Sequence, residues 1–327
     1  MANLTTDYMG LSLKNPIIVS SSGLTDSVEK IIELEKHGAG AVVLKSLFEE
    51  QIMMDIDANR MNNIFGTYSD SEDYIGYYTR KNALSSYIDL VDGAKDKCGI
   101  PVIASINCYS ADQWPEFAGD VEAAGADALE LNMFIMPSDP AITGAEIEKM
   151  YLDIVNKVVT NVTIPVSLKI HHYFSGMSNF LVELSKTGIK SLVLFNRFYQ
   201  PDVDLEKGKI ISGHVYSSPA DNALVLRWLT ILSGRVECDL AASTGIHSGE
   251  SALKNIFSGA NAVQIASVVY QKGPLVIASI INEMNLWLDN HGYTSSAEIT
   301  GKLRQSDSIK PMVYERAQFM KYFSDVR

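Results

Sequence analysis

Cysteine, positive charge and long apolar runs are all scarce in this sequence of 327 residues. Its three cysteines, Cys98, Cys108 and Cys238, have no CxxC spacing and are odd in number, which argues against a zinc site and against a disulfide framework. Lysine and arginine together number 27 against 39 for aspartate and glutamate, so the formal net charge is −12. An acidic chain is poorly suited to nucleic acid or to an anionic membrane surface, and we expect neither as a partner.

Membrane segments are missing as well. No apolar stretch reaches the length of a transmembrane helix, and the first residues lack the basic region and apolar core of a signal peptide. With its thiols expected to stay reduced, the chain is predicted to be cytoplasmic and to hold no metal. Hydrophobic residues make up 46% of it, enough for a large core, and we expect a single domain over residues 1–327.

One short pattern recurs four times along the chain. A helix-like end is followed by a glycine (Gly38, Gly125, Gly188 or Gly259), then by a short apolar run and a closing polar residue. Glycine after a helix adopts the left-handed conformation without steric cost. A strand that is apolar along its whole length suits a parallel sheet covered on both faces. The pattern therefore indicates repeated βαβ units.

Eight such strands can be placed, near residues 17, 41, 102, 128, 166, 191, 239 and 262, and helical patterns separate most of them. Strands and helices in this alternation predict an α/β fold, the (β/α)8 TIM barrel. An open doubly wound sheet is the alternative, but no GxGxxG follows the first strand. Residues Leu4–Leu13 predict an N-terminal β-hairpin, with Met9 and Gly10 near its turn, that closes the bottom of the barrel.

Three connections that follow strands are predicted to be long loop insertions: 47–80, 133–144 and 197–218. Such βα loops surround the active site of a TIM barrel, so we expect them to form a pocket or lid. The first carries several tyrosines that would cover the pocket; a surface insertion or a dimer contact is the alternative. These are Tyr68, Tyr74, Tyr77 and Tyr78.

Polar residues stand where the predicted strands end, and in a TIM barrel these ends meet at one opening. Lys45 and Lys169 would share that opening with the amides of Asn132 and Asn196. The combination suits a planar, electron-accepting heterocycle with an anionic tail. A lysine stabilises the negative charge that appears on reduction, and asparagine can donate and accept at the edge of the ring. For any single residue the alternative is a polar side chain that merely ends a strand at the solvent.

The last two strands predict a phosphate site. Their ends read AASTGIHSG (241–249) and QIASV (264–268). Backbone amides at this place, with the N-terminus of a short helix, bind phosphate in TIM barrels. We assign the phosphate to Thr244, Gly245, Ala266 and Ser267. An ordinary glycine-containing turn is the alternative.

These residues and motifs resemble the dihydroorotate dehydrogenase family over nearly the whole chain, nearer its soluble class 1 branch. The opening LKNPIIVSSSG is similar to the family's NP…ASG strand, ALELN to the start of ELNxSCPN, and PVSLKI to P(V/L)xxKL. The longest match is the tail, TGIHSGESALKNIFSGANAVQIASVVYQKGP followed by HGY and ITGKL.

The resemblance implies FMN at the top of the barrel, a small-molecule substrate and a homodimer. It leaves room for a separate electron-transfer partner. Besides the phosphate site, the positions that it implies for FMN are Ser21, Ser22, Lys45, Ser46, Asn132, Lys169, Asn196, Ser212 and Gly213.

Two parts of the family pattern are missing. The fourth position of NxSCPN carries the base that removes a proton from dihydroorotate, a cysteine or, in the other class, a serine. Here Ile135 occupies it, and an alkyl group accepts no proton. The family's NxxGLPN substrate loop after the second strand is also unmatched. Thr244 and Ala266 replace two phosphate-site glycines, but a backbone amide can bind phosphate without glycine. FMN binding is thus less affected than dihydroorotate chemistry.

Two functions remain open. The first is an FMN-dependent oxidoreductase acting on a CH–CH bond of dihydroorotate or a related molecule, in pyrimidine biosynthesis by resemblance, with Lys45, Asn132 and Asn196 at the reacting site. The second is a non-catalytic FMN-binding sensor or regulatory protein, which the missing base favours.

A relocated base would have to come from a neighbouring residue. His171 is the first candidate, because histidine titrates near neutral pH. His172, Tyr173 and Cys108 are further candidates. For each of them, packing or solvent exposure is the alternative explanation.

Overall fold

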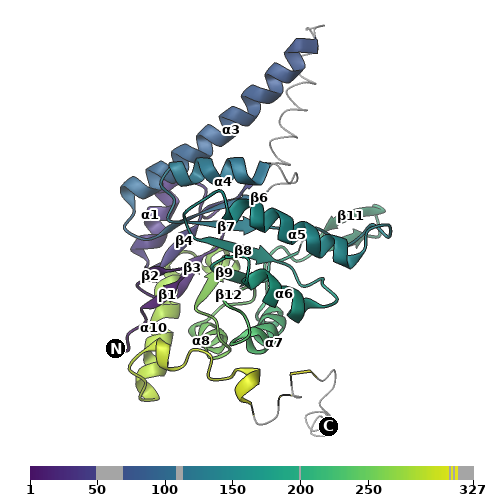
Figure 1. The fold of residues 1–327 in the computed structure, drawn as a ribbon. Coiled ribbons are helices and arrows are strands. Elements are labelled where there is room, and N and C mark those ends of the chain that lie inside the picture. Colours follow the sequence, from purple (N-terminus) through teal and green to yellow (C-terminus); the bar gives the residue numbers. More distant parts are fainter. Residues whose placement is uncertain (49–68, 108–112, 199, 309–310, 312–313, 316–327) are drawn as a thin grey trace.

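Eight parallel strands form a ring that helices surround (Figure 1). The structure is a computed structural model that describes residues 1–48, 69–107, 113–198, 200–308, 311 and 314–315, with the backbone alone for 69–81 and 113. Pairing of β4 with β6 and of β3 with β13 closes the ring, which confirms the predicted (β/α)8 TIM barrel. The barrel strands are β3 (Ile17–Val19), β4 (Ala41–Val43), β6 (Val102–Asn107), β7 (Ala128–Asn132), β8 (Val166–Ile170), β9 (Ser191–Leu194), β12 (Asp239–Ser243) and β13 (Ala262–Ile265).

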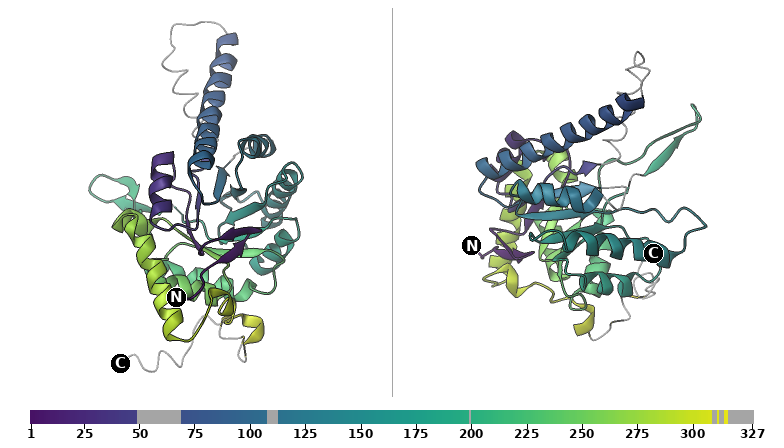
Figure 2. Two further views of the ribbon diagram at one scale, coloured as in Figure 1. Left: turned by 90° about the vertical axis from the view of Figure 1, so that its left-hand side faces the viewer. Right: turned by 45° about the horizontal axis from the view of Figure 1, so that its top comes forward.

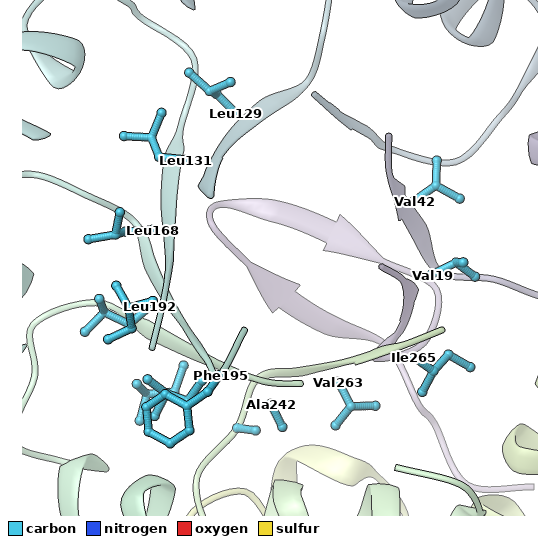
Figure 3. Close-up of a cluster of buried hydrophobic side chains, with 14 of the residues drawn as sticks. Val19, Val42, Leu129, Leu131, Leu168, Leu192, Phe195, Ala242, Val263 and Ile265 are labelled. Carbon is cyan, nitrogen blue, oxygen red and sulfur yellow. The ribbon is translucent and has the colours of Figure 1, made fainter. Parts of the chain in front are cut away.

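The strands are buried on both faces, as their continuous apolar runs predict. Outward-facing side chains such as Val42, Leu129 and Leu192 point away from the ring (Figure 3) and belong to the larger of two core clusters, which they share with helix residues. The covering helices are α1 (Val28–Lys36), α3 (Ser69–Lys97), α4 (Gln113–Ala123), α5 (Gly144–Val159), α6 (Met177–Ser185), α7 (Asn222–Leu232), α8 (Gly249–Phe257), α9 (Ser267–Lys272) and α10 (Leu275–Asn290). None of the described helices is both long enough and apolar enough to cross a lipid bilayer.

The N-terminal hairpin consists of β1 (Thr6–Tyr8) and β2 (Leu11–Leu13), as predicted. Met9 and Gly10 both have positive φ, 59° and 79°, the backbone of a tight hairpin turn. The Met9 amide donates to the Asp239 carboxylate at 2.7 Å, and Asp239 is the first residue of β12. The hairpin lies across one opening of the ring (Figure 3) and packs against inward-facing strand side chains, so it closes the N-terminal end of the barrel.

Four glycines join helices to strands in the left-handed conformation that the recurring pattern predicts. Their φ angles are 101° at Gly38, 87° at Gly125, 97° at Gly188 and 114° at Gly259. At Gly259 an added Cβ would also stand 2.1 Å from the Ser233 hydroxyl, so both the backbone and the available space require glycine there.

Two of the three long connections differ from the prediction. The assignment of 47–80 as a loop is wrong at both ends: β5 (Leu47–Phe48) pairs with β6, and α3 already begins at Ser69. Two lysines in the last turn of this helix, Lys95 and Lys97, suit the helix dipole. Residues 49–68 and the side chains of 69–81, hence the expected tyrosine cover, lie outside the described part of the chain.

The connection after β9 contains a hairpin that the sequence did not predict, formed by β10 (Pro201–Asp204) and β11 (Lys209–Ser212). Gly208, with φ 58°, lies in its turn. The hairpin and α3 both extend beyond the body of the barrel (Figures 1 and 2). The connection after β7 is irregular from Met133 to Thr143, as predicted.

Candidate active site

A cavity opens where the carboxyl ends of the strands meet. Its volume is about 130 Å³, and it is open to the solvent. It unites residues that are far apart in the sequence and that were expected at the site, Ser21, Lys169, Asn196 and the four phosphate-site positions. The full lining is Ser20, Ser21, Lys169, Asn196, Arg197, Ser217, Ser243, Thr244, Gly245, Ile246, Gln264, Ile265, Ala266 and Ser267. We call it the mouth cavity.

Lys169 reaches the mouth cavity from a buried polar network. Its Nζ donates to Ser20 Oγ at 2.8 Å and to Gln264 Oε1 at 3.0 Å, and lies 3.6 Å from Glu130 Oε1. Gln264 Nε2 donates to the other oxygen of Glu130 at 2.5 Å. The side chains of Lys169 and Glu130 are only 6% and 1% exposed. Buried charges are costly unless they are paired, so this network keeps a cation at the cavity.

Glu130 and Gln264 were not predicted as site residues. The signal was available, because each is a polar residue inside an otherwise apolar strand, ALELN for β7 and AVQI for β13. A polar side chain at a strand position buried on both faces needs a partner inside the barrel. Here the two are partners of one another and of Lys169.

Two of the phosphate-site residues lie in a tight turn after β12. Thr244 and Gly245 have φ of 81° and 79°. At Gly245 an added Cβ would approach the backbone nitrogen of Asn222 to 2.4 Å, so glycine is required there. Thr244 is strained, since a β-branched residue rarely adopts this conformation, and its hydroxyl donates to the Phe195 carbonyl at 3.1 Å.

Ser217 links the two halves of the phosphate site. Its hydroxyl accepts the Gly245 amide proton at 3.3 Å, and its own amide donates to the Ser267 hydroxyl at 3.0 Å. Both partners line the mouth cavity. Ser217 was not predicted, because it lies in the long connection after β9, where no motif identified it.

The two asparagines contact each other: Asn196 Nδ2 donates to Asn132 Oδ1 at 2.7 Å. Asn196 lines the mouth cavity, and Asn132, which is buried, lies behind it. Ser46 likewise stands behind a lining residue, because its hydroxyl lies 3.0 Å from that of Ser21 and 2.7 Å from that of Ser105.

Four other predicted FMN contacts are not among the lining residues. Ser22 donates its hydroxyl to the Ser20 carbonyl. Lys45 follows β4 with an exposed side chain. Ser212 lines a neighbouring hollow together with Arg197 and Tyr216, and the Gly213 amide donates to the Gln200 carbonyl at 2.8 Å.

His171, the first candidate base, is fully buried and does not line the mouth cavity. Its ring stacks on Phe174 at 4.5 Å, and its Nδ1 accepts the Tyr173 amide proton at 2.8 Å. Burial lowers the pKa of His171 to about 4, which leaves it neutral at physiological pH. His172 lines an adjoining hollow instead, and Cys108 lies outside the described residues.

The segment in place of the family's base carries no proton acceptor in its side chains. Ile135 packs against the hydrophobic core, and its amide donates to the Tyr151 hydroxyl at 3.2 Å. The next residue, Met136, is half exposed and lines the same hollow as His172. Within the described part of the chain, no cluster of three or more His, Cys, Asp or Glu side chains could hold a metal ion.

Comparison with known proteins gives a consistent result. The family model described as dihydroorotate dehydrogenase matches residues 3–288. A dihydroorotate dehydrogenase B (NAD(+)) catalytic subunit from Thermoplasma acidophilum is 27% identical over 312 residues, covering 92% of this chain and 99% of the relative. The protein of that name from Thermoplasma volcanium is 24% identical, with 92% and 98% covered. A putative dihydroorotate dehydrogenase A (fumarate) from Aeropyrum pernix is 28% identical over 218 residues, with 63% and 68% covered.

Proposed function

The chain belongs to the dihydroorotate dehydrogenase family, and from that premise we propose that it is an FMN-dependent oxidoreductase acting on a CH–CH bond of a small substrate. The observation that carries this proposal is Lys169, a buried cation held at the mouth cavity by Glu130 and Gln264. Maintaining a charge there is costly, and a cofactor that becomes anionic on reduction gives that charge a function.

The lining of the mouth cavity fits FMN. Lys169 and the amide of Asn196 would border the flavin ring, and Ser21 lies in the same lining. The strained turn at Thr244 and Gly245, with Ala266 and Ser267 at the end of β13, would hold the phosphate. When bound, FMN supplies the site with an acceptor for a hydride from the substrate.

The residues of this chain have distinct tasks at such a site. Lys169 stabilises negative charge at the cavity, and its network of three partners fixes the position of its ammonium group. Asn132 orients the amide of Asn196, which can then donate and accept hydrogen bonds toward a bound ring. Lys45 is exposed after β4 and is not among the residues that line the mouth cavity.

Dihydroorotate itself is a poor candidate substrate. Its oxidation requires removal of a proton from one carbon while a hydride leaves the neighbouring carbon. Ile135 carries an alkyl side chain that packs against the core, and Met136 carries a thioether, so neither side chain accepts that proton. The proposed substrate is therefore a different molecule, whose CH–CH bond would lose its proton to another group, such as His172 in the adjoining hollow. A role in pyrimidine biosynthesis rests on the resemblance alone.

A non-catalytic FMN-binding role as a sensor or regulator is the second candidate, and the absence of a base in the segment 133–137 favours it. The two differ in whether a small molecule reduces the bound flavin. Anaerobic mixing of the FMN-loaded protein with candidate reductants, followed at the flavin absorbance, separates them. Reduction identifies an oxidoreductase, and a flavin that only dithionite reduces identifies the regulatory role.

Two partners belong to the proposal. The β10–β11 hairpin exposes Val203 and Ile210, with Ile210 73% exposed, and an isolated two-stranded hairpin is marginally stable in water. We propose that a second copy of the chain covers it in a homodimer. Because the relatives above are described as catalytic subunits, a separate electron-transfer partner is proposed as well. Light scattering on the purified protein tests the homodimer, and a monomeric mass at micromolar concentration contradicts it.

The phosphate site provides the most selective test of FMN as the cofactor. Binding of FMN and of riboflavin to flavin-free protein can be compared by fluorescence quenching. The charge-assisted hydrogen bonds to phosphate should make FMN tighter by about 10-fold or more. Equal affinities for the two flavins would contradict this assignment.

A further inference from the structure

A second hollow adjoins the mouth cavity, and we call it the side cleft. The two share Asn196, Arg197 and Thr244 in their linings. Its other walls come from the connections after β7, β8 and β9 and from the start of α7. A molecule in the side cleft would therefore lie beside whatever occupies the mouth cavity and would contact some of the same residues.

The walls of the side cleft combine an aromatic and apolar part with polar residues. Tyr173 and Phe198 face each other with ring centroids 4.8 Å apart, and Met136 and Leu224 also line the cleft. Tyr173 is 44% exposed and Met136 51% exposed. Aromatic and thioether surface that stays accessible within a concave site is typical of sites that bind flat apolar molecules.

One cation stands between the two hollows. Arg197 donates to the carbonyls of Val215 (2.7 Å) and His214 (2.5 Å), and it forms no ion pair with any described residue. A guanidinium carries five N–H donors, so each terminal nitrogen keeps one further donor. Asp221 is the acid in the lining, and its carboxylate accepts the amide proton of Ser218 at 2.7 Å. Arg197 is therefore left to attract an anionic group.

His172 is the second polar group of the side cleft. Its ring touches Phe195 and Phe198, and burial lowers its pKa, so it is neutral at pH 7 and adds no second positive charge. Its Nδ1 is buried and has no hydrogen-bond partner among the described residues. A neutral imidazole there can exchange a hydrogen bond or a proton with the ligand.

We propose that the side cleft is the substrate site and that its substrate is a carboxylic acid with a flat, apolar, aromatic or conjugated body. The carboxylate pairs with Arg197, and the body lies against Tyr173 and Phe198. This inference rests on the proposed function and names its substrate class.

The test uses the purified, FMN-loaded protein and calorimetric titration with cinnamate, with its neutral amide cinnamamide and with crotonate, which has the acid but no ring. Charge-assisted hydrogen bonds are about twice as strong as neutral ones, so cinnamate should bind about 10-fold more tightly than cinnamamide. Loss of the ring contacts should weaken crotonate by a similar factor. Undetectable cinnamate binding at millimolar concentration, or equal binding of acid and amide, overturns the proposal.

Variants assign the preference to residues. Arg197→Met should abolish the preference for acid over amide, and Arg197→Lys should retain part of it. Phe198→Ala should weaken both ligands by similar factors. Arg227→Met, which removes the same charge from an exposed position on α7 outside the lining, is the matched control and should bind like the unmodified protein. An unchanged acid preference in Arg197→Met, or the same loss in Arg227→Met, overturns the role of Arg197.

The flavin content of each sample keeps this test separate from that of the proposed function. A yellow protein that does not bind cinnamate contradicts only the proposal that the side cleft is the substrate site. A protein that takes up no FMN contradicts the proposed function, whatever cinnamate does.

Discussion

Replacing either Lys169 or Glu130, which form a buried ion pair, should destabilise the fold far more than the small change in side-chain volume would. The two charges lie 3.6 Å apart with 6% and 1% of their side chains exposed. At an effective dielectric constant of about 20, Coulomb's law gives an attraction of about 5 kcal/mol at that distance. Breaking a buried pair leaves the other charge without compensation, which typically costs about 3–5 kcal/mol. Lys169→Met and Glu130→Gln should each lower the free energy of unfolding by that amount.

The double variant distinguishes the pair from simple loss of packing. With both charges gone, Lys169→Met/Glu130→Gln should be about as stable as either single variant, giving a coupling energy of about 3–5 kcal/mol. The assay is urea unfolding of flavin-free protein, so that changes in FMN affinity do not enter. Lys254→Met, which breaks the exposed pair between Lys254 and Glu250, is the control and should hardly move the midpoint. Additive losses, or single variants as stable as the parent, would refute the reasoning.

Three further predictions concern single positions. Burial holds the pKa of His171 at about 4 in the folded protein, below its ordinary value of 6.5. The unfolded chain therefore takes up a proton at this residue first as the pH falls. The free energy of unfolding should be highest above pH 6.5 and should decrease by up to about 3 kcal/mol as the pH falls toward 4. His171→Asn keeps an acceptor for the Tyr173 amide but does not titrate, so its unfolding free energy should depend less on pH, and an unchanged profile would contradict this. Thr244 has a φ of 81°, so Thr244→Gly should have a free energy of unfolding about 1 kcal/mol higher than Thr244→Ala in denaturant unfolding, the reverse of the usual order. A more stable alanine variant would show that the turn is not strained. Oxidation of dihydroorotate by the unmodified protein should be undetectable, and Ile135→Cys should not restore it. A general base contributes about 10²–10⁴-fold to the rate only when the substrate is also positioned. Robust turnover of dihydroorotate by the unmodified protein would overturn that account.

The sequence was most informative where a local pattern has one structural explanation. The glycines that precede the strands, such as Gly38 and Gly188, require a left-handed turn, and their repetition identified the barrel. Because strand ends in this fold meet at one opening, Lys169 and Asn196 could be assigned to a common site from the sequence alone.

Interactions across the barrel were less accessible. Glu130 and Gln264 are 134 residues apart, and nothing local to either reveals that they share a hydrogen bond. His171 has the right chemistry for a base, but its neighbours Phe174 and Tyr151 bury it, and that packing depends on tertiary structure. The β10–β11 hairpin was missed because its strands are exposed, so burial imposes no clear alternation on them.

The chromophore of the purified protein tests the central claim most directly. Absorbance of the native protein, followed by chromatography of the flavin that denaturation releases, gives both its identity and its stoichiometry. A family member with this mouth cavity should be yellow and release close to one FMN per chain, and Lys169→Met should retain less. A colourless protein that also fails to take up added FMN would contradict the account.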